Sequence, residues 1–258
     1  MISFFRRVKK RLLEESKVGS YLAYAIGEII LVVLGILIAI QINKINTNRV
    51  DRQYEYNYLE AVSANLKEDI KEIQLRLKKD SVHLTAQTDL VRAFTNDSIR
   101  SDEEKMKYIM HNSAVISYFN PQNTAFEDMK SSGNLDLIRD DSLRYQILEY
   151  YNFSQRVVSS QEINNELFLK YKDRALDQSL DMNSLIEPQL PEEWQAEVSP
   201  FDNSYFGSNQ SAAMQEDFAR NISLMKASVW INHNWKKALL QEAQEVHNSI
   251  ETYLEEQD

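Results

Sequence analysis

The most pronounced pattern in the chain is a continuous apolar stretch near its amino terminus. It runs from Tyr21 to Ile42 with the sequence "YLAYAIGEIILVVLGILIAIQI". A helix rises about 1.5 Å per residue, so this stretch would be about 33 Å long, and the hydrocarbon core of a bilayer is about 30 Å thick. The pattern therefore predicts a transmembrane helix over residues 21–43.

A cleaved signal peptide has a similar basic start and apolar middle, and it is the main alternative for this stretch. The apolar core of a signal peptide is usually only ~7–15 residues long and is followed by a small-x-small cleavage site. Here the residues "AIQ" place Gln41 where a small residue belongs. The sequence therefore favours an uncleaved signal anchor.

Beyond the apolar stretch, large aliphatic residues recur every seven positions in two interleaved sets. This spacing predicts one helix that continues from the anchor to about Phe94, with an apolar seam of the coiled-coil type along one side. The first set is Leu59, Leu66 and Ile73, and the second set is Ile70, Leu77, Leu84 and Val91.

The carboxyl-terminal part of the chain, from about Ser211 to Glu256, has the most regular repeat. Its seam positions alternate by four and three residues and are apolar except for Asn232 and Lys236 at the middle. Polar residues on such a seam usually fix register or partner number. We expect this helix to be an antiparallel neighbour of the helix that follows the anchor. The seam positions are Phe218, Ile222, Met225, Val229, Asn232, Lys236, Leu239, Ala243, Val246, Ile250 and Tyr253.

Shorter helices are predicted between these two long ones. The segment 101–119 reads as a helix that starts with a capping box from Ser101 to Glu104 and ends before Pro121. A short helix follows and is closed by Gly133, since glycine suits the left-handed conformation of a helix end.

A third helix is predicted to begin at the acidic caps Asp140 and Asp141 and to run towards Leu180. The stretch 185–208 contains three of the four prolines and is predicted to be rich in loops and turns.

Composition supports a helical fold. The 258 residues include only 5 Gly and 4 Pro, and neither type occurs between Ile36 and Asn120. Without helix breakers, long helices are favoured over short strands joined by turns. The predicted fold class is all-α: an N-terminal transmembrane helix that continues into a long helix, with an extracytoplasmic antiparallel helical bundle. The predicted domains are a basic head (1–20), the membrane helix (21–43) and the helical domain (44–258).

Charge is distributed unevenly and indicates the orientation of the anchor. Residues 1–20 hold six basic residues against two acidic ones, whereas the whole chain has a net charge of -10. On the other side of the apolar stretch stand only Lys44, Arg49 and Arg52. Basic residues concentrate on the cytoplasmic side of a membrane helix. We therefore expect a cytoplasmic amino terminus and a carboxyl-terminal domain outside the cytoplasm; if the source is a bacterium with two membranes, the anchor lies in the inner membrane and this domain in the periplasm.

The basic head also shows helical spacing of Phe5, Val8 and Leu12. This pattern is typical of a short helix in the headgroup layer that contacts anionic lipid; a plain translocation signal is an equal alternative. The acidic remainder of the chain argues against nucleic-acid binding. The basic residues expected to face lipid are Arg6, Arg7, Lys9, Lys10 and Arg11.

One acid, Glu28, lies in the cytoplasmic half of the apolar stretch. Three interpretations are open: a carboxylate that reaches headgroup water, a contact between membrane helices, and proton coupling as in single-pass stator subunits of proton-driven motors. The helix contact is supported by two small-xxx-small pairs, which allow close approach of backbones. Together with Glu28, the residues of this predicted contact are Ala23, Gly27, Gly35 and Ala39.

Two stretches resemble a known family. "YAIGEIILVVLGILIAIQIN" in the anchor and "NTAFEDMKSSGNLDLIRDDSLRYQILEYYN" at 123–152 are similar to uncharacterised single-pass membrane proteins of Bacteroidota, of flavobacterial type, which form a domain-of-unknown-function family. The resemblance implies a basic head, one membrane helix and a helical periplasmic body. It implies no catalytic residue.

The sequence contains no recognisable set of catalytic or metal-binding residues. The chain has no cysteine, no glycine-rich phosphate loop and no metal motif among its four histidines, which are expected on the surface. We predict no cofactor, no metal and no enzymatic activity.

Two function classes remain. The first is a membrane-anchored interaction or scaffold protein that forms homo-oligomers or binds another envelope protein. The second is a ligand-sensing bundle, which would need a partner because no second membrane helix returns to the cytoplasm.

Overall fold

The computed structural model describes residues 18–93, 95–176 and 211–256, and it contains helices and no strands within these ranges. The all-α prediction is confirmed. The head residues Arg6, Arg7, Lys9, Lys10 and Arg11 and the predicted loop region 185–208 lie outside the described residues. The elements are α2 (Val18–Arg92), α3 (Asp97–Arg100), α4 (Glu103–Ser113), α5 (Thr124–Ser131), the 3-10 helix η1 (Leu135–Leu137), α6 (Asp141–Leu176) and α9 (Ala212–Glu255).

The chain divides into two units, Met1–Asn57 (unit 1) and Tyr58–Asp258 (unit 2). Helix α2 contributes to both units as one α-helix of 75 residues. The predicted long helix is thus confirmed, and its end at Arg92 is close to the expected Phe94. The lack of glycine and proline between Ile36 and Asn120 explains the absence of a break.

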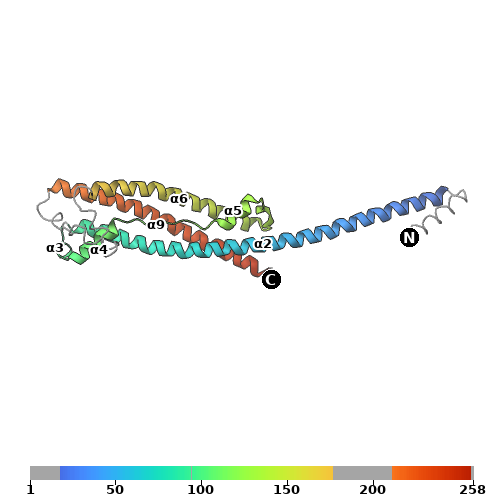
Figure 1. The fold of residues 1–258 in the computed structure, drawn as a ribbon, viewed down its shortest axis with the longest axis horizontal. Helices are drawn as coiled ribbons and strands as arrows, with labels where there is room; N and C mark the ends of the chain where they lie inside the picture. Colours follow the sequence, from blue (N-terminus) through green and yellow to red (C-terminus); the bar gives the residue numbers. More distant parts are fainter. Residues whose placement is uncertain (1–17, 94, 177–210, 257–258) are drawn as a thin grey trace, which may run out of the picture. The chain divides into compact units, whose positions relative to one another are not determined.

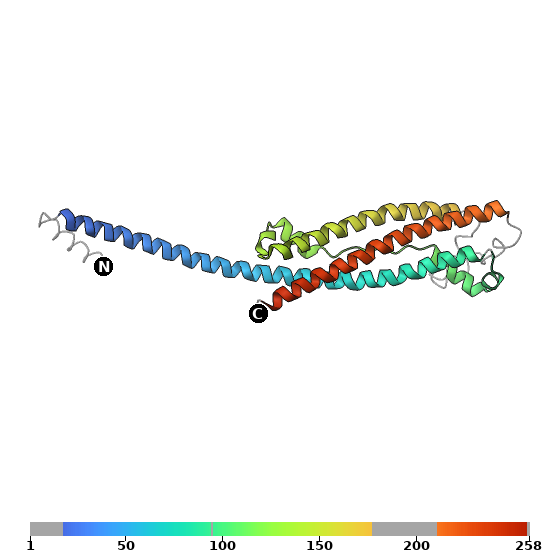
Figure 2. The ribbon, with the colours of Figure 1, turned by 180° about the vertical axis from the view of Figure 1, so that it is seen from behind.

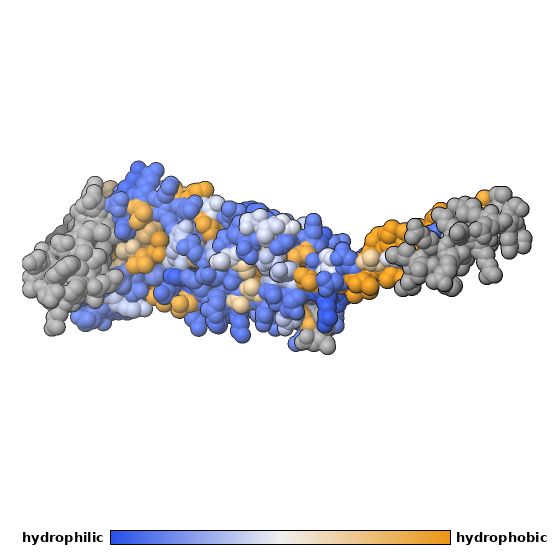
Figure 3. All heavy atoms as spheres, turned by 45° about the vertical axis from the view of Figure 1, so that its right-hand side comes forward, coloured by the Kyte–Doolittle hydropathy of each residue, from blue (hydrophilic) through white to orange (hydrophobic). Residues whose placement is uncertain are grey.

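The described part of unit 1 is the first part of α2. Its side chains are exposed from Ile26 to Val50, and Leu31 and Ile42 are each 63% exposed. Figure 3 shows the apolar surface of this part of α2 in orange. Among the described residues, α2 is the one helix that is long and apolar enough to be a candidate membrane span by length and composition.

In unit 2, the second part of α2 lies alongside α6 and α9 (Figures 1 and 2). Helix α9 runs antiparallel to α2, because Lys226 contacts Thr88 near one end, Lys236 contacts Asp80 at the middle and Ser63 contacts Glu251 near the other end. Helix α6 also runs antiparallel to α9, since Phe153 packs against Trp235 and Asn164 bonds to Asn232.

The predicted helix over 101–119 is wrong in its second half. Helix α4 ends at Ser113, and the chain then continues without regular structure to Asn123. We call residues 114–123 the strap. Figures 1 and 2 show it as a thin extended ribbon that runs back along the long helices from α4 to α5. The cap also differs from the prediction: Asp102, rather than Ser101, accepts the hydrogen bond from the Lys105 amide.

The connection from α5 to α6 agrees with the predictions. Gly133 has a φ of 73° and directly follows Ser132, the C-cap of α5, as a left-handed helix end requires. The Asp140 side chain accepts a hydrogen bond from the Leu143 amide at 2.8 Å and caps α6.

Unit 2 has two apolar cores, one towards each end of its long helices. The first includes Leu59, Leu66 and Ile73 of α2 with Leu239 to Ile250 of α9. The second includes Leu90 of α2 with Phe218 to Val229 of α9. Every predicted seam residue of α9 is buried except Tyr253, which is half-buried. In α2 the first predicted set is buried, whereas Ile70, Leu77, Leu84 and Val91 are only partly buried.

Candidate functional site: a buried polar layer

A layer of buried polar side chains separates the two apolar cores. Each of the three long helices contributes to it, and so do the end of α4 and the strap. We call this set the polar layer; its members are Asp80, His83, Gln87, Ser113, Ser117, Gln161, Asn164, Asn232 and Lys236.

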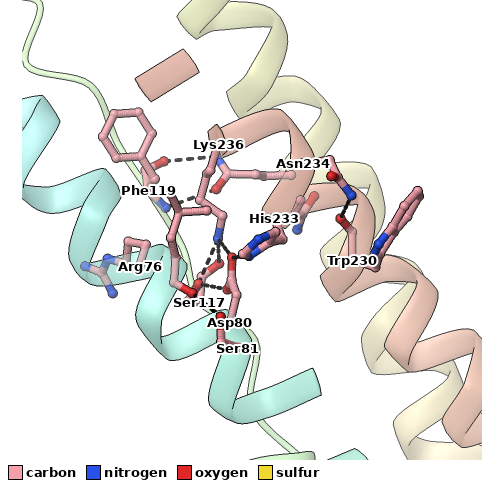
Figure 4. A network of polar contacts seen from close by, with 12 residues as sticks. Arg76, Asp80, Ser81, Ser117, Phe119, Trp230, His233, Asn234 and Lys236 are labelled. Carbon is pink, nitrogen blue, oxygen red and sulfur yellow. Dashed lines mark hydrogen bonds and ion pairs between the residues drawn. The ribbon is translucent and has the colours of Figure 1, made fainter. Parts of the chain in front are cut away.

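An ion pair between α2 and α9 forms the centre of the layer. Lys236 Nζ lies 2.7 Å from Asp80 Oδ2, and both side chains are fully buried. Lys236 also donates to the hydroxyl of Ser117 at 2.8 Å and to its carbonyl at 3.4 Å. The Ser117 hydroxyl in turn donates to Asp80 Oδ1. Figure 4 shows these three side chains pointing toward one another, with His233 beside Asp80.

This arrangement satisfies the ammonium group completely. Lys236 has three N–H donors, and the structure gives it three acceptors: one carboxylate oxygen and two oxygens of Ser117. Burial lowers the pKa of Lys236 below its ordinary value, and Asp80 opposes that effect. Because a buried charge without a partner is very costly, each of the two side chains depends on the other.

Two further side chains of α2 bind the end of α4. His83 Nδ1 lies 2.9 Å from the carbonyl of Asn112, and Gln87 donates to the carbonyl of Ser113 at 3.1 Å. The last carbonyls of a helix need partners outside the helix. The two side chains of α2 supply these partners, which explains why α4 ends where the strap begins.

The strap is also bound through its main chain. Gln161 of α6 accepts from the Phe119 amide at 3.1 Å and donates to the Phe119 carbonyl at 3.0 Å. This pair replaces the bonds that a neighbouring strand would provide. Both backbone groups of the fully buried Phe119 are therefore paired although this residue lies in no strand or helix.

Asp69 of α2 binds the other end of the strap. Its carboxylate accepts from the Gln122 amide at 2.8 Å and from the Tyr150 hydroxyl at 2.6 Å. Desolvation by burial raises the pKa of Asp69 to about 6, although the two hydrogen bonds oppose the rise. Asp69 is thus a carboxyl group that titrates just below neutral pH.

Asn232, predicted as a polar seam residue, pairs with α6. Its amide oxygen accepts from Asn164 at 2.9 Å, and its amide nitrogen donates to Asn165 at 3.3 Å. The structure thus brings Asn232 and Lys236 into the same layer, where one binds α6 and the other binds α2 and the strap.

The polar-layer residues of α2 were not predicted from the sequence, although their spacing indicates them. Starting from Leu59, the alternation of three and four residues runs through Val62, Leu66, Asp69, Ile73, Arg76, Asp80, His83, Gln87 and Leu90. The second predicted set contains only apolar residues and flanks these buried positions. Its members are Ile70, Leu77, Leu84 and Val91. The expectation that all histidines lie on the surface is wrong for His83, which is 6% exposed.

The chemical capacity of the layer is limited. A serine beside a lysine is a known nucleophile arrangement, in which the amine must take the hydroxyl proton. Here the Ser117 hydroxyl donates to Asp80 and accepts from Lys236, so the lysine has no free electron pair for that proton. Among the described residues, no group of three or more His, Cys, Asp or Glu could hold a metal ion.

The predicted membrane-helix contact residues all lie on α2. Gly27, Glu28, Gly35 and Ala39 are exposed, and a Cβ added at Gly27 or Gly35 would meet no atom within 4 Å. At about 100° per residue, Glu28, Gly35 and Ala39 share one side of the helix, whereas Gly27 lies about 100° and Ala23 about 140° away from Glu28.

Comparison with known proteins identifies a family. A family model described as a family of unknown function, DUF6090, matches residues 28–184, which is more than half of the chain. The chain belongs to the DUF6090 family. The matched range contains Asp69, Asp80, Ser117 and Gln161, whereas Lys236 on α9 lies beyond it. No curated protein and no solved structure matches this DUF6090 chain.

Removing one partner of the central ion pair should destabilise unit 2 strongly. We expect Lys236→Met to lower the free energy of unfolding by about 3–5 kcal/mol, because Asp80 would stay buried without its partner. The double variant Asp80→Leu/Lys236→Met should lose less than the two single variants together. Urea unfolding of the full chain in detergent, followed by circular dichroism, measures these changes.

The adjacent exposed residue provides the control for this experiment. Lys237→Met should change the free energy of unfolding by no more than about 0.5 kcal/mol, as is usual for surface substitutions. A loss in Lys236→Met as small as in Lys237→Met would refute the role given to the ion pair.

Asp69 should make stability depend on pH. Because its folded pKa is raised to about 6, the folded state holds this proton more tightly than the unfolded state. Its contribution is therefore complete below pH 4 and is lost as the pH rises through 6, at a total cost on the order of 3 kcal/mol. The isosteric Asp69→Asn variant lacks this dependence.

The difference between the unfolding free energies of wild type and Asp69→Asn should therefore change between pH 4 and pH 7, with the wild type losing stability relative to the variant as pH rises. Other titrating groups, including His83, affect both proteins and cancel in the difference. A difference that stays constant across this range would show that Asp69 titrates normally.

Proposed function

We propose that this DUF6090 chain is a non-enzymatic interaction or scaffold protein anchored in the bacterial inner membrane. The observation that carries the proposal is the composition of α2. Its first part presents apolar side chains that no other described part of the chain covers, and its second part supplies the core of unit 2. A single helix therefore serves as anchor and as structural element of the body.

The direction of insertion follows from the basic residues. The six basic residues among the first 20 positions exceed the three that follow the apolar stretch closely, at Lys44, Arg49 and Arg52. The positive-inside rule then places the amino terminus in the cytoplasm and the antiparallel helical bundle of unit 2 in the periplasm. The basic head supports lipid binding on the cytoplasmic side.

The polar layer supports a structural role for the body. Its ion pair and hydrogen bonds join α2, α6, α9 and the strap, and its two central charges, Asp80 and Lys236, pair with each other. A body held in one arrangement in this way suits a protein that presents surfaces to other chains, which we propose to be copies of itself or other envelope proteins.

A ligand-sensing role through a partner is the second candidate, and one feature favours it. A groove of about 290 Å³ lies where the strap and α5 meet α6, and Asn120, Asn152 and Gln155 line it together with Lys130. Proton coupling through Glu28 has less support, since it rests only on a likeness in layout to single-pass stator subunits.

The anchoring proposal predicts the behaviour of a doubly tagged full-length chain. The protein should remain in the membrane pellet after alkaline carbonate extraction and should keep its amino-terminal tag, because the apolar stretch is not cleaved. External protease should reach the carboxyl-terminal tag only when the outer membrane is opened. A soluble chain, a chain that has lost its amino-terminal tag or a protected carboxyl-terminal tag would contradict the proposal.

A further inference from the structure

The alternation that places side chains in the core of unit 2 does not stop where unit 2 begins. Counted back from Leu59 in steps of four and three, it continues without a break through α2 to Gly27. We call this set the anchor seam; its members are Gly27, Leu31, Leu34, Ile38, Gln41, Ile45, Asn48, Arg52 and Glu55.

The surroundings of the two parts of this pattern differ. From Leu59 onward, α9 and the strap cover the seam within the chain. From Gly27 to Arg52, by contrast, the seam is exposed, with Leu34 at 49% and Ile38 and Ile45 at 59% each, and only its last member, Glu55, is buried. A pattern of this kind is typical of helices that pack against another helix along their length.

Two side-chain amides indicate what packs against the anchor seam. Gln41 lies within the apolar stretch, and Asn48 follows one heptad later on the same side of the helix. An amide carries both a donor and an acceptor, so it can pair with an identical amide across a two-fold axis. A glutamine that lies among the hydrocarbon tails also gains from such a pair, because these tails offer no hydrogen bond.

Membrane anchoring supplies the geometry for this pairing. Two copies inserted in the same direction are parallel, so equal residues lie at equal depth and Gln41 meets Gln41. Gly27 allows two backbones to approach closely near the cytoplasmic end, since glycine has no side chain to separate them. Like charges at Arg52 would repel across the axis and so limit the contact to about 32 Å of helix, from Gly27 to Asn48.

We propose that the anchor seam is the interface of a parallel homodimer, in which α2 of one copy packs against α2 of a second copy through Leu31, Ile38 and Ile45, with Gln41 and Asn48 paired across the axis. This inference rests on the proposed membrane anchoring. It places Glu28, Gly35 and Ala39 beside the interface rather than in its centre.

The chain has no cysteine, so single cysteines can be introduced into the full-length protein in native membranes. We expect oxidation with copper phenanthroline to give several-fold more disulfide-linked dimer for Ile45→Cys and Asn48→Cys than for Asn43→Cys and Val50→Cys. Asn43 and Val50 are the matched controls, because they lie on the opposite side of α2, one heptad apart.

A substitution tests the amide pair separately. In the Ile45→Cys background, Gln41→Leu should reduce the dimer yield several-fold, whereas Asn43→Leu, on the opposite side, should leave it unchanged. Loss of dimer in both variants would refute the specific role of Gln41.

Three other results would contradict the proposed dimer. They are equal yields at all four cysteine positions, a maximum at Asn43→Cys and Val50→Cys, and seam adducts with a protein of different mass. Failure of the anchoring itself is distinguishable, since the chains would then be recovered in the soluble fraction. Membrane-bound chains without a preference for the seam would contradict the dimer alone.

Discussion

The ion pair between Asp80 and Lys236 is the interaction on which the rest of unit 2 depends. Both side chains are fully buried and 2.7 Å apart, so water cannot compensate either charge. They come from helices that are far apart in the sequence, and Ser117 of the strap completes their hydrogen bonds. The pair therefore forms only when α2, α9 and the strap are all in place.

The strap follows from this constraint. An extended segment inside a helical unit leaves backbone groups that no neighbouring strand can pair, and buried polar groups without partners are costly. Gln161 and Asp69 supply partners for the backbone of Phe119 and Gln122, while His83 and Gln87 bind the last carbonyls of α4, just before the strap. The extended conformation of the strap therefore depends on side chains from the neighbouring helices. The polar layer interrupts the apolar packing between the two cores, and its specific pairs favour one register of the helices over alternatives.

Much of the fold could be predicted from the sequence, because apolar spacing in long helices is a strong signal. The limits of α9 and the length of α2 followed from it, and the end of α5 followed from the conformational preference of Gly133. The strap could not be predicted, since "SAVISYF" continues the apolar pattern of α4 and its extended form depends on side chains from other helices. Asp69, Asp80 and His83 were not predicted for a related reason. They are polar residues at the same helical spacing as the buried apolar residues, and a pattern of apolar residues alone does not include them. Lys236 was singled out as a seam residue, but its partner became visible only in three dimensions.

The most direct measurement of the central claim is amide hydrogen exchange across the strap in the full chain. If the ion pair holds the strap in place, the amides of Phe119 and Gln122 should be protected in the wild type and in Lys237→Met, and should exchange much faster in Lys236→Met. Unchanged protection of these two amides in Lys236→Met would show that the strap does not depend on the buried pair, and would contradict the account.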